Sequence, residues 1–447
     1  MDPAILATYN RPVPRYTSYP TAAQFGPAVG PAEHVAWLAD LDGVSTALYF
    51  HVPFCRELCW YCACNTMAMR RHGTLDAYAD ALLSELERVA NTAPGLVVDA
   101  IQWGGGTPGQ LGADRLRRIG RRIDGLFDRK SDAEIAFEID PRYCDAELAA
   151  ALADLHVTRV SLGVQDFDPT VQLAINRPQS FADTSAAVER VRGCGIAQIN
   201  VDLVYGLPHQ TLDSLARTLD QAVALSPARF AVFGYAHVPW MKPHQRLIDE
   251  SALPDLALRA QMVELVADKL VAAGYVRIGL DHYARPEDPM ARAAADGSLH
   301  RNFQGYVANE APWVVGIGAS AISSLPRGFS QNTADASGYM AAISSGSLAT
   351  ARGLAVTEDD KLRADIIQRL MCQHSVDLEE CCRSHHVDPG AFLAGIDQLE
   401  TLERDGLVRS DGLRLAVTEA GRPLVRFVCA AFDRHLAGGP GRHASGV

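Results

Sequence analysis

The sequence lacks an apolar run of about 20 residues, the length that a membrane-spanning helix requires. It also lacks a basic segment followed by an apolar run near its start, so no secretory signal is predicted. Basic residues are in the minority, with 41 Lys and Arg against 53 Asp and Glu and a formal charge of −12. Because phosphate groups bind to basic surfaces, we expect a cytoplasmic protein that binds neither nucleic acid nor membranes.

A composition typical of disordered chains is also absent. Apolar residues make up 48% and charged residues 21% of the 447 residues, which is ordinary for globular proteins. A chain of this length folds around a large core without needing a disulfide or a structural metal. Thiols stay reduced in the cytoplasm, so the ten cysteines need another explanation.

Short apolar runs alternate with amphipathic stretches between residues 45 and 285. Strands are predicted over residues 46–52, 97–103, 134–140, 158–164, 198–206, 228–238 and 275–284. Helices are predicted over residues 74–90, 113–127, 145–155, 181–195 and 211–225. This alternation is typical of the α/β class and predicts a partial or full parallel (β/α) barrel. A doubly wound open sheet would give a similar pattern.

Three segments are predicted along the chain. Residues 1–44 form an N-terminal extension, and residues 45–350 form the barrel domain, in which 286–350 resemble loops and short elements. Residues 351–447 form a mostly helical, winged-helix-like domain with a small hairpin over 405–421. Acidic residues crowd this last segment, which argues against DNA binding. A mobile tail is predicted over residues 437–447.

Four cysteines lie within ten residues after the first predicted strand: Cys55, Cys59, Cys62 and Cys64. Thiolates bind zinc, copper(I) and iron–sulfur clusters. Structural zinc sites usually pair two C-x2-C motifs across a longer loop, and the sequence has no second motif. Three thiolates can hold a [4Fe–4S] cluster and leave its fourth iron open to a ligand. Buried, inert thiols are the remaining alternative, and four in one loop argue against it.

Further unusual residues follow successive predicted strands, whose carboxyl ends meet at one edge of a parallel barrel. The run Gly104–Gly106 lets the backbone approach a ligand closely. Glu138, Gln165 and Asp202 follow later strands; a carboxylate suits an ammonium or a ribose diol, and an amide suits a hydroxyl. Arg177 can bind a carboxylate through two hydrogen bonds. Each residue alone is more often a solvated side chain, so their grouping carries the prediction.

The spacing C-x3-C-x-Tyr-C, with Tyr61 as the aromatic residue, resembles the radical S-adenosylmethionine enzymes. The resemblance implies that the open iron binds the amino and carboxylate groups of S-adenosylmethionine. The reduced cluster then cleaves this cofactor to methionine and a 5′-deoxyadenosyl radical. A partial or full barrel with the cluster loop after its first strand is also implied.

A closer resemblance covers residues 9–340 and is to the family of oxygen-independent coproporphyrinogen III oxidases, or coproporphyrinogen dehydrogenases. The segments that resemble those of the family, in the same order along the chain, are YNRPVPRYTSYPTA, HVPFCRELCWYCACN, GGGTP, FEIDPR, GVQDF, INRPQ, VDLVYGLP, YAHVP, LHRNFQGY and GASAIS. The resemblance implies an oxidoreductase of haem synthesis. It would convert two propionates of coproporphyrinogen III to vinyl groups without oxygen, giving protoporphyrinogen IX. A substrate radical would lose carbon dioxide and one electron.

The family resemblance also implies a set of site residues. The iron ligands would be Cys55, Cys59 and Cys62, with Cys64 nearby but not on iron. Two S-adenosylmethionine molecules are implied. The cluster-bound molecule would be lined by Tyr49, Gly105, Glu138 and Ile322. The second would be lined by Tyr61, Gly106, Thr107, Gln165, Arg177, Asp202 and Ala236.

Partners follow from the same chemistry. The substrate propionates are anionic, so arginines should receive them, and the candidates are Arg11, Arg15, Arg285 and Arg301. The first two would make the N-terminal extension a substrate-contacting segment. A low-potential electron donor is implied but not identified. No assembly motif appears, so a monomer is predicted.

Two alternatives remain. Related haem chaperones share the barrel and the three-cysteine loop but lack the PRYTSYP opening and the fourth loop cysteine, both of which are present here. A zinc-bound structural protein is the second alternative.

Overall fold

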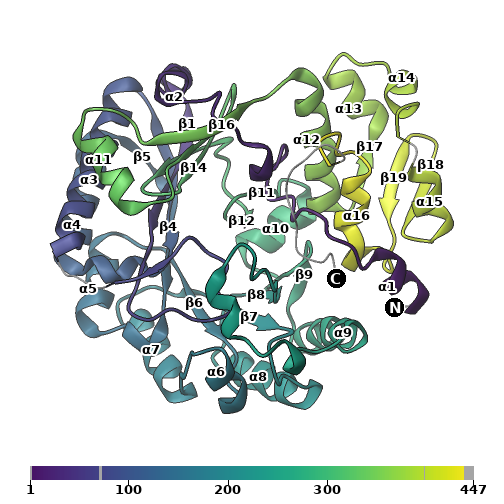
Figure 1. Cartoon of the computed structure of the whole chain (residues 1–447), viewed down its shortest axis with the longest axis horizontal. Helices are drawn as coiled ribbons and strands as arrows, with labels where there is room; N and C mark the ends of the chain where they lie inside the picture. Colours follow the sequence, from purple (N-terminus) through teal and green to yellow (C-terminus); the bar gives the residue numbers. More distant parts are fainter. Residues whose placement is uncertain (1–2, 70–72, 397, 437–447) are drawn as a thin grey trace.

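The computed structural model describes residues 3–69, 73–396 and 398–436 (Figure 1). The predicted tail, 437–447, lies outside the described residues. Twelve strands form one sheet in the order β16-β15-β14-β13-β1-β4-β5-β6-β7-β8-β10-β9. Strands β13 to β8 in this order are parallel, and the strands at both ends are antiparallel. Because the sheet has two free ends, the barrel is partial, and the predicted α/β class is confirmed.

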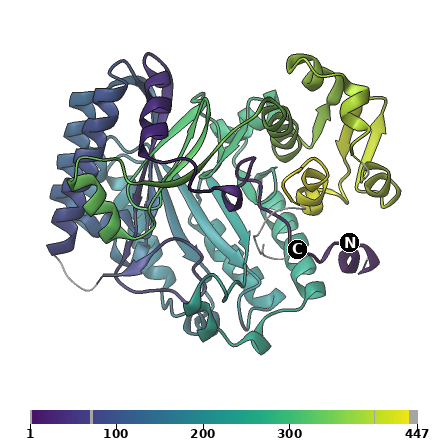
Figure 2. The same ribbon diagram turned by 45° about the horizontal axis from the view of Figure 1, so that its top comes forward.

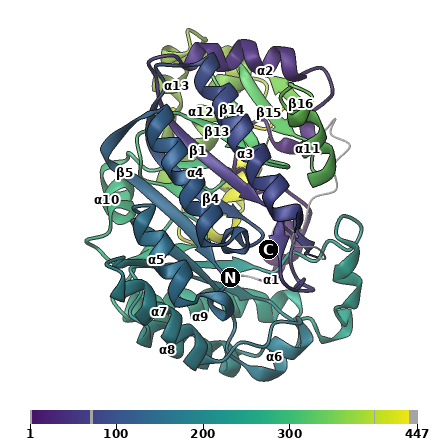
Figure 3. The same cartoon turned by 90° about the vertical axis from the view of Figure 1, so that its left-hand side faces the viewer.

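The parallel strands are β13 (Trp313–Ile317), β1 (Ser45–Val52), β4 (Val97–Gly105), β5 (Asp128–Ile139), β6 (Arg159–Gln165), β7 (Gln198–Tyr205) and β8 (Arg229–Gly234). The helices that follow them are α3 (Gly73–Thr92), α4 (Ala113–Leu126), α5 (Ala146–Asp154), α7 (Phe181–Gly193), α8 (Leu212–Ala224) and α9 (Leu256–Ala272). Figure 3 shows α3, α4 and α5 lying over one face of β1, β4 and β5. Side-chain caps begin α5, α7, α8 and α9, and Ser180 and Thr211 form capping boxes at α7 and α8.

The remaining strands of the sheet are β14 (Ile322–Leu325), β15 (Gly328–Asn332), β16 (Thr350–Ala355), β9 (Val276–Ile278) and β10 (His282–Ala284). Other short elements are α1 (Pro3–Tyr9), α2 (Pro31–Leu38), β2 (Phe54–Cys55), β3 (Met67–Ala68), α6 (Pro169–Ala174), α10 (Pro289–Asp296), β11 (His300–Asn302), β12 (Gly305–Val307) and α11 (Ala336–Ser344). Strand β16 crosses the predicted domain boundary at residue 350. No described helix combines the length and apolarity of a membrane span.

Two sequence predictions differ from the structure. The predicted strand 275–284 is a hairpin of β9 and β10, in which Ile278 pairs with His282. The chain reverses at Gly279, whose φ of 55° suits a residue without Cβ. The segment 286–350, predicted as loops and short elements, contributes β13, β14 and β15 to the main sheet. Few apolar residues mark β14 and β15, whereas β13 is a short apolar run that the prediction left among the loops.

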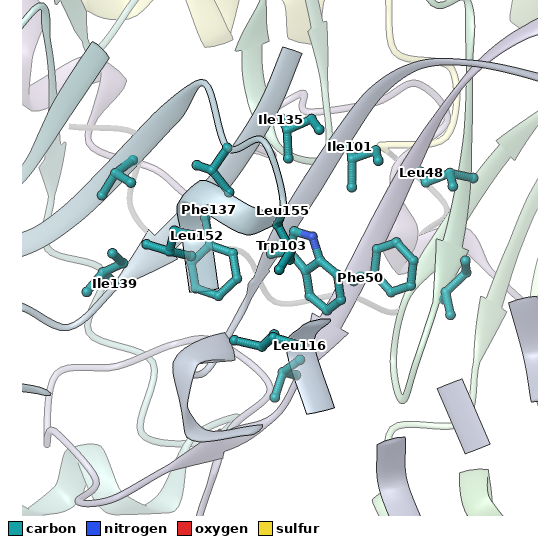
Figure 4. Packing of buried hydrophobic residues seen from close by; sticks show 14 of the residues in the cluster. Leu48, Phe50, Ile101, Trp103, Leu116, Ile135, Phe137, Ile139, Leu152 and Leu155 are labelled. Carbon is teal, nitrogen blue, oxygen red and sulfur yellow. The ribbon is translucent and has the colours of Figure 1, made fainter. Parts of the chain in front are cut away.

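The sheet core lies between the strands and the outer helices. Phe50 and Trp103 stack with ring centroids 4.2 Å apart, and Phe137 follows at 6.0 Å from Trp103. Figure 4 shows these rings from β1, β4 and β5 beside Leu116 and Leu152 of the covering helices. Burial of such rings fixes the relative height of the three strands, and so the height of the loops that follow them.

The C-terminal region lies to one side of the sheet, as Figure 2 shows in yellow and yellow-green. Its elements are α12 (Glu358–Gln373), β17 (Ser375–Asp377), α13 (Leu378–Ser384), α14 (Pro389–Leu393), α15 (Leu399–Arg404), β18 (Val408–Asp411), β19 (Arg414–Val417) and α16 (Val425–Ala430). Strands β18 and β19 form the predicted hairpin. The N-terminal segment packs here: Tyr9, Val13, Tyr16 and Tyr19 belong to the same apolar cluster as α12 and α16.

One buried carboxylate connects α3 to the sheet beyond β1. Glu85, which is 1% exposed, accepts hydrogen bonds from the Gly318 amide at 2.8 Å and the Tyr339 hydroxyl at 2.7 Å. Its other oxygen accepts from the Asn332 amide at 2.7 Å. Burial raises the pKa of Glu85 to about 7 because the charged form loses its hydration.

This raised pKa predicts a pH-dependent stability. Between the ordinary pKa of 4.5 and about 7, the folded protein keeps a proton that the unfolded chain has released, so the free energy of unfolding falls as pH rises. We subtract the unfolding free energy of Glu85→Gln from that of the wild type. This difference should decrease by about 1–3 kcal/mol as the pH rises across this range. Urea unfolding measures it. Glu87→Gln, which changes a half-exposed carboxylate on the same helix, is the control. A pH-independent difference would contradict the prediction.

Candidate active site

A cavity of about 1260 Å³ opens at the carboxyl ends of the parallel strands. It exceeds the volume of roughly 300–1,000 Å³ that is typical of a single small-molecule site, so it has room for more than one ligand. Its wall contains most of the predicted site residues, namely Cys55, Cys59, Tyr61, Cys62, Gly105, Gly106, Thr107, Glu138, Gln165, Arg177, Asp202 and Ala236. Cys64 lies there as well.

Tyr49 and Ile322 lie outside this wall. The Tyr49 hydroxyl is 3.0 Å from Nδ1 of His51, and the His51 ring lies directly behind Gly105, where a Cβ would come within 2.7 Å of it. Ile322 begins β14 and pairs with Gln331 in the sheet. Both residues therefore lie behind the cavity surface.

Each of the three predicted ligand thiols faces a polar group of the protein. The Thr107 hydroxyl donates to Cys55 Sγ at 3.7 Å, and Arg177 Nη1 donates to Cys59 Sγ at 3.3 Å. The Thr66 hydroxyl lies 4.0 Å from Cys62 Sγ. Donors of this kind stabilise thiolates, the form that binds metals.

The cysteine pair at the end of the loop is electrostatically asymmetric. A hydrogen bond with Cys64 lowers the pKa of Cys62 to about 6, whereas the same bond raises the pKa of Cys64. Burial raises the pKa of Cys55 to about 12. Of the adjacent pair, Cys62 is thus the better thiolate, which agrees with its predicted role as a ligand.

The donor set suits an iron–sulfur cluster. All ten cysteines are free thiols. Within the described ranges, no three His, Cys, Asp or Glu side chains are arranged around a point that would hold a single metal ion. Thiolates on separate irons of a cubane need not converge on one point, whereas the ligands of a tetrahedral zinc ion must.

The glycine run forms a close-fitting ledge against the cysteine loop. A Cβ at Gly106 would lie 2.8 Å from the Phe54 carbonyl oxygen and 3.0 Å from Cys55 Sγ. A Cβ at Gly104 would lie 2.8 Å from a Glu138 carboxylate oxygen. Glycine is therefore required for backbone contact on both sides of the ledge.

Two acidic groups lie in the middle of the cavity wall. Glu138 accepts a hydrogen bond from the Gly105 amide at 3.2 Å, and burial followed by repulsion from Asp202 raises its pKa to about 7. Asp202 accepts from the Ser161 hydroxyl at 2.8 Å and from Asn200 at 2.7 Å, and burial raises its pKa. Both sites favour a cationic or hydroxyl-bearing ligand, which would offset the buried negative charge.

Arg177 shares the carboxylate of Asp140 with a second arginine, Arg142. Nη1 of Arg177 lies 3.1 Å from Asp140, and its Nη2 donates to the Gly163 carbonyl at 2.5 Å. Arg142 binds the same carboxylate at 2.7 Å. Although burial opposes ionisation, the two arginines keep the pKa of Asp140 below its usual value. The prediction of Arg177 did not include Asp140 and Arg142, which appear in the sequence only within the FEIDPR motif.

Sequence reasoning also missed a loop that holds the cysteine loop by its backbone. Lys242 Nζ donates to the Cys64 carbonyl at 2.7 Å, and His244 Nε2 lies 2.7 Å from the Cys62 carbonyl. The fully buried Gln245 donates to the Tyr61 carbonyl at 2.8 Å. The polar segment KPHQ, which follows the YAHVP motif after Trp240 and Met241, was the available signal.

The four arginines that were predicted to contact the substrate lie in different parts of the structure. Arg15 and Arg301 line the cavity. Arg11 lies over the Phe427 ring at 5.6 Å, away from the cavity wall. The prediction for Arg285 is wrong: its amide donates to the Ala228 carbonyl at the amino end of β8, and its guanidinium lies 4.0 Å from the Tyr275 ring centroid. It is therefore at the opposite end of the sheet from the cavity.

Known proteins share this architecture. Residues 49–222 match the radical SAM superfamily, and residues 356–424 match the HemN C-terminal domain. The oxygen-independent coproporphyrinogen III oxidase of Bradyrhizobium diazoefficiens is 48% identical, with 97% of each chain covered. Its namesake from Paracoccus denitrificans is 41% identical, with 98% of each chain covered. The solved coproporphyrinogen III oxidase (HemN) from Escherichia coli, described as a radical SAM enzyme, has a TM-score of 0.91 and 35% identity over 97% of this chain and 99% of that chain.

The glycine ledge gives a steric prediction. Gly106→Ala should push the cysteine loop away, at a cost of about 1–3 kcal/mol, and reduce the iron bound per chain after anaerobic reconstitution. Iron and sulfide analysis measures this. Gly125→Ala, in α4 with no atom within 4 Å of its Cβ, is the matched control and should bind iron like the wild type. Full iron content in Gly106→Ala would show that the contact is not needed.

Proposed function

The chain belongs to the family of oxygen-independent coproporphyrinogen III oxidases in the radical SAM superfamily, and we propose that its cavity holds one [4Fe–4S] cluster and two S-adenosylmethionine molecules. The enzyme is an oxidoreductase. It converts two propionate side chains of coproporphyrinogen III to vinyl groups without oxygen, giving protoporphyrinogen IX. The observation that carries the cofactor proposal is the placement of three thiols, each facing a polar group, beside a glycine ledge.

Cys55, Cys59 and Cys62 would bind the cluster, and Cys64 would tune Cys62 through their hydrogen bond. When bound, the cluster and S-adenosylmethionine supply a 5′-deoxyadenosyl radical for removal of a hydrogen atom from each reacting propionate. The protein excludes water and keeps the reacting groups aligned, which is where its own residues contribute to the rate.

The cluster-bound S-adenosylmethionine would meet Gly105 and Glu138 directly. The Glu138 carboxylate is half-buried and lines the cavity, so it suits the ammonium group. Tyr49 would support this site through His51, whose ring backs Gly105. Ile322 would contribute only backbone groups from β14.

The second S-adenosylmethionine would lie farther along the wall. Its contacts would be Tyr61, Gly106, Thr107, Gln165, Arg177, Asp202 and Ala236. Asp202 would bind ribose hydroxyls, because its half-buried carboxylate has two oxygens that can accept from them. The size of the cavity is consistent with two cofactors beside a substrate.

We further propose the three-domain division at residues 44 and 350, with β16 carrying the chain across the second boundary. The N-terminal extension would contact the tetrapyrrole through Arg15, and the barrel would contact it through Arg301. An unidentified low-potential donor would reduce the cluster of a monomeric enzyme. Free thiols support a reducing, cytoplasmic location. A haem chaperone and a zinc-bound protein are not favoured, because full-length relatives carry the oxidase name.

The central test is an anaerobic assay with coproporphyrinogen III, S-adenosylmethionine and a reductant. Wild-type protein should form a vinyl tetrapyrrole, whereas Cys59→Ala should lose cluster iron and all cleavage of S-adenosylmethionine while still folding. Cys64→Ala should keep its iron, and Cys194→Ala, at the end of α7, is the control. Cleavage by Cys59→Ala would refute the ligand assignment. An iron-loaded wild type without vinyl product would refute the function.

The number of cofactors is tested separately by equilibrium binding of labelled S-adenosylmethionine. Asp202→Asn should remove one of two bound molecules per chain and leave the iron content unchanged, because the carboxylate lies away from the cysteine loop. Asp213→Asn, exposed on α8, is the matched control. Wild-type binding of a single molecule would contradict the second site.

A further inference from the structure

A smaller cavity of about 290 Å³, which we call the arginine pocket, adjoins the central cavity. It lies among β8, α9, the β9–β10 hairpin, the N-terminal segment and α16. Its arginines are Arg15, Arg259, Arg277, Arg301 and Arg426. The two cavities share Arg15, Arg301 and Asp281, together with residues 233–236, so a ligand in one can extend into the other.

The charge of the arginine pocket is not balanced by its own wall. Five arginines stand against two carboxylates, Glu264 and Asp281. Asp281 is also engaged by His282, whose Nδ1 lies 2.7 Å from its carboxylate. The surplus of positive charge inside a half-closed cavity is costly without an anion.

Two of the arginines have unused donors. In the part of the chain that the structure describes, Nε of Arg277 has no hydrogen-bond partner, and neither do Nε and Nη1 of Arg301, although all three atoms are buried. Burial first, and then the charge of Arg15, lowers the pKa of Arg426 to about 10. Buried donors without partners are rare, and a carboxylate would supply acceptors for them.

The rest of the wall identifies the kind of anion. Leu6, Val232, Phe233, Leu256 and Val263 surround the guanidinium groups with apolar surface. A small hydrated anion gains nothing from such surface, whereas a carboxylate attached to an apolar ring system does. The pocket also contains no residue of the cysteine loop among its described lining residues. A carboxylate bound here is therefore held away from the site of radical formation.

We propose that the arginine pocket binds propionate carboxylates of the tetrapyrrole that are not being decarboxylated, and so positions the reacting propionate in the central cavity. This inference rests on the proposed function of the central cavity and adds a subsite to it. Arg15 and Arg301, at the junction, contact the tetrapyrrole from both cavities, while Arg259, Arg277 and Arg426 bind only the retained carboxylates.

The test uses the reconstituted enzyme under anaerobic conditions and two fluorescent probes, coproporphyrin III and its tetramethyl ester. The double variant Arg277→Gln/Arg426→Gln should weaken binding of coproporphyrin III by about tenfold to a hundredfold, because two charge-assisted contacts are lost. It should bind the ester like the wild type. Arg383→Gln, with a side chain 71% exposed on α13, removes the same charge elsewhere and should leave both affinities unchanged.

Several outcomes separate the two proposals. Equal affinity of the wild type and the double variant for coproporphyrin III would overturn the pocket assignment. The assignment would also fail if the tetramethyl ester bound the wild type as tightly as the acid does. Displacement of coproporphyrin III by an equal concentration of acetate would overturn it as well. If the double variant does not fold, Arg277→Gln alone carries the test. A wild type that binds coproporphyrin III but makes no vinyl product would overturn the proposed function while leaving the carboxylate subsite supported.

Discussion

Two backbone hydrogen bonds join the end of β4 to the start of the cysteine loop. The Gly106 amide donates to the Val52 carbonyl at 2.8 Å, and the Thr107 amide donates to the Phe54 carbonyl at 2.9 Å. They extend the parallel pairing of β1 and β4 beyond the sheet and set the position of Cys55. The loop is held on its other side by Lys242 and Gln245 through carbonyl groups alone. Backbone contacts thus position the loop, while Thr107 and Arg177 donate hydrogen bonds to two of its sulfur atoms.

Negative and positive side chains occupy different parts of the two cavities. The middle strands carry the carboxylates Glu138 and Asp202, and the sheet edge near β8 to β10 carries arginines. A sulfonium cofactor with an ammonium group suits the first environment, and a substrate with four carboxylates suits the second. Arg229, in the wall of the central cavity, pairs with the buried Asp288 at 2.7 Å, and paired buried charges cost less than isolated ones. In the proposed complex, this separation would place the substrate carboxylates at the arginines and the cofactors at the acidic strands.

The sequence predicted the site better than the sheet that supports it. The cysteine loop and the glycine run are local signals, and parallel strands bring the residues that follow them to one edge, so Glu138, Gln165 and Asp202 could be grouped without coordinates. Strands β13 to β15 were not recognised, since they are short and β13, which joins them to the sheet, pairs with β1 from a distant part of the chain. Arg285 was misplaced because 275–284 was taken as one strand. Reversal at Gly279 sends the chain back to the amino end of β8.

The C-terminal region contributes to the site although none of the iron ligands lies in it. Tyr9 donates to Asp405 at 2.7 Å, and Tyr16 donates to Asp433 at 3.0 Å, so the N-terminal segment is bound on the C-terminal core. Arg15 directly precedes Tyr16 and donates to the Gly234 carbonyl at 3.3 Å, at the end of β8. Its backbone is therefore fixed by one domain while its guanidinium reaches the other. Arg426 comes to the same pocket from α16. Both arginines depend on this packing, so under the proposed carboxylate assignment the C-terminal region would act on substrate position rather than on the cluster, and its loss would impair binding of the tetrapyrrole before it impaired radical formation.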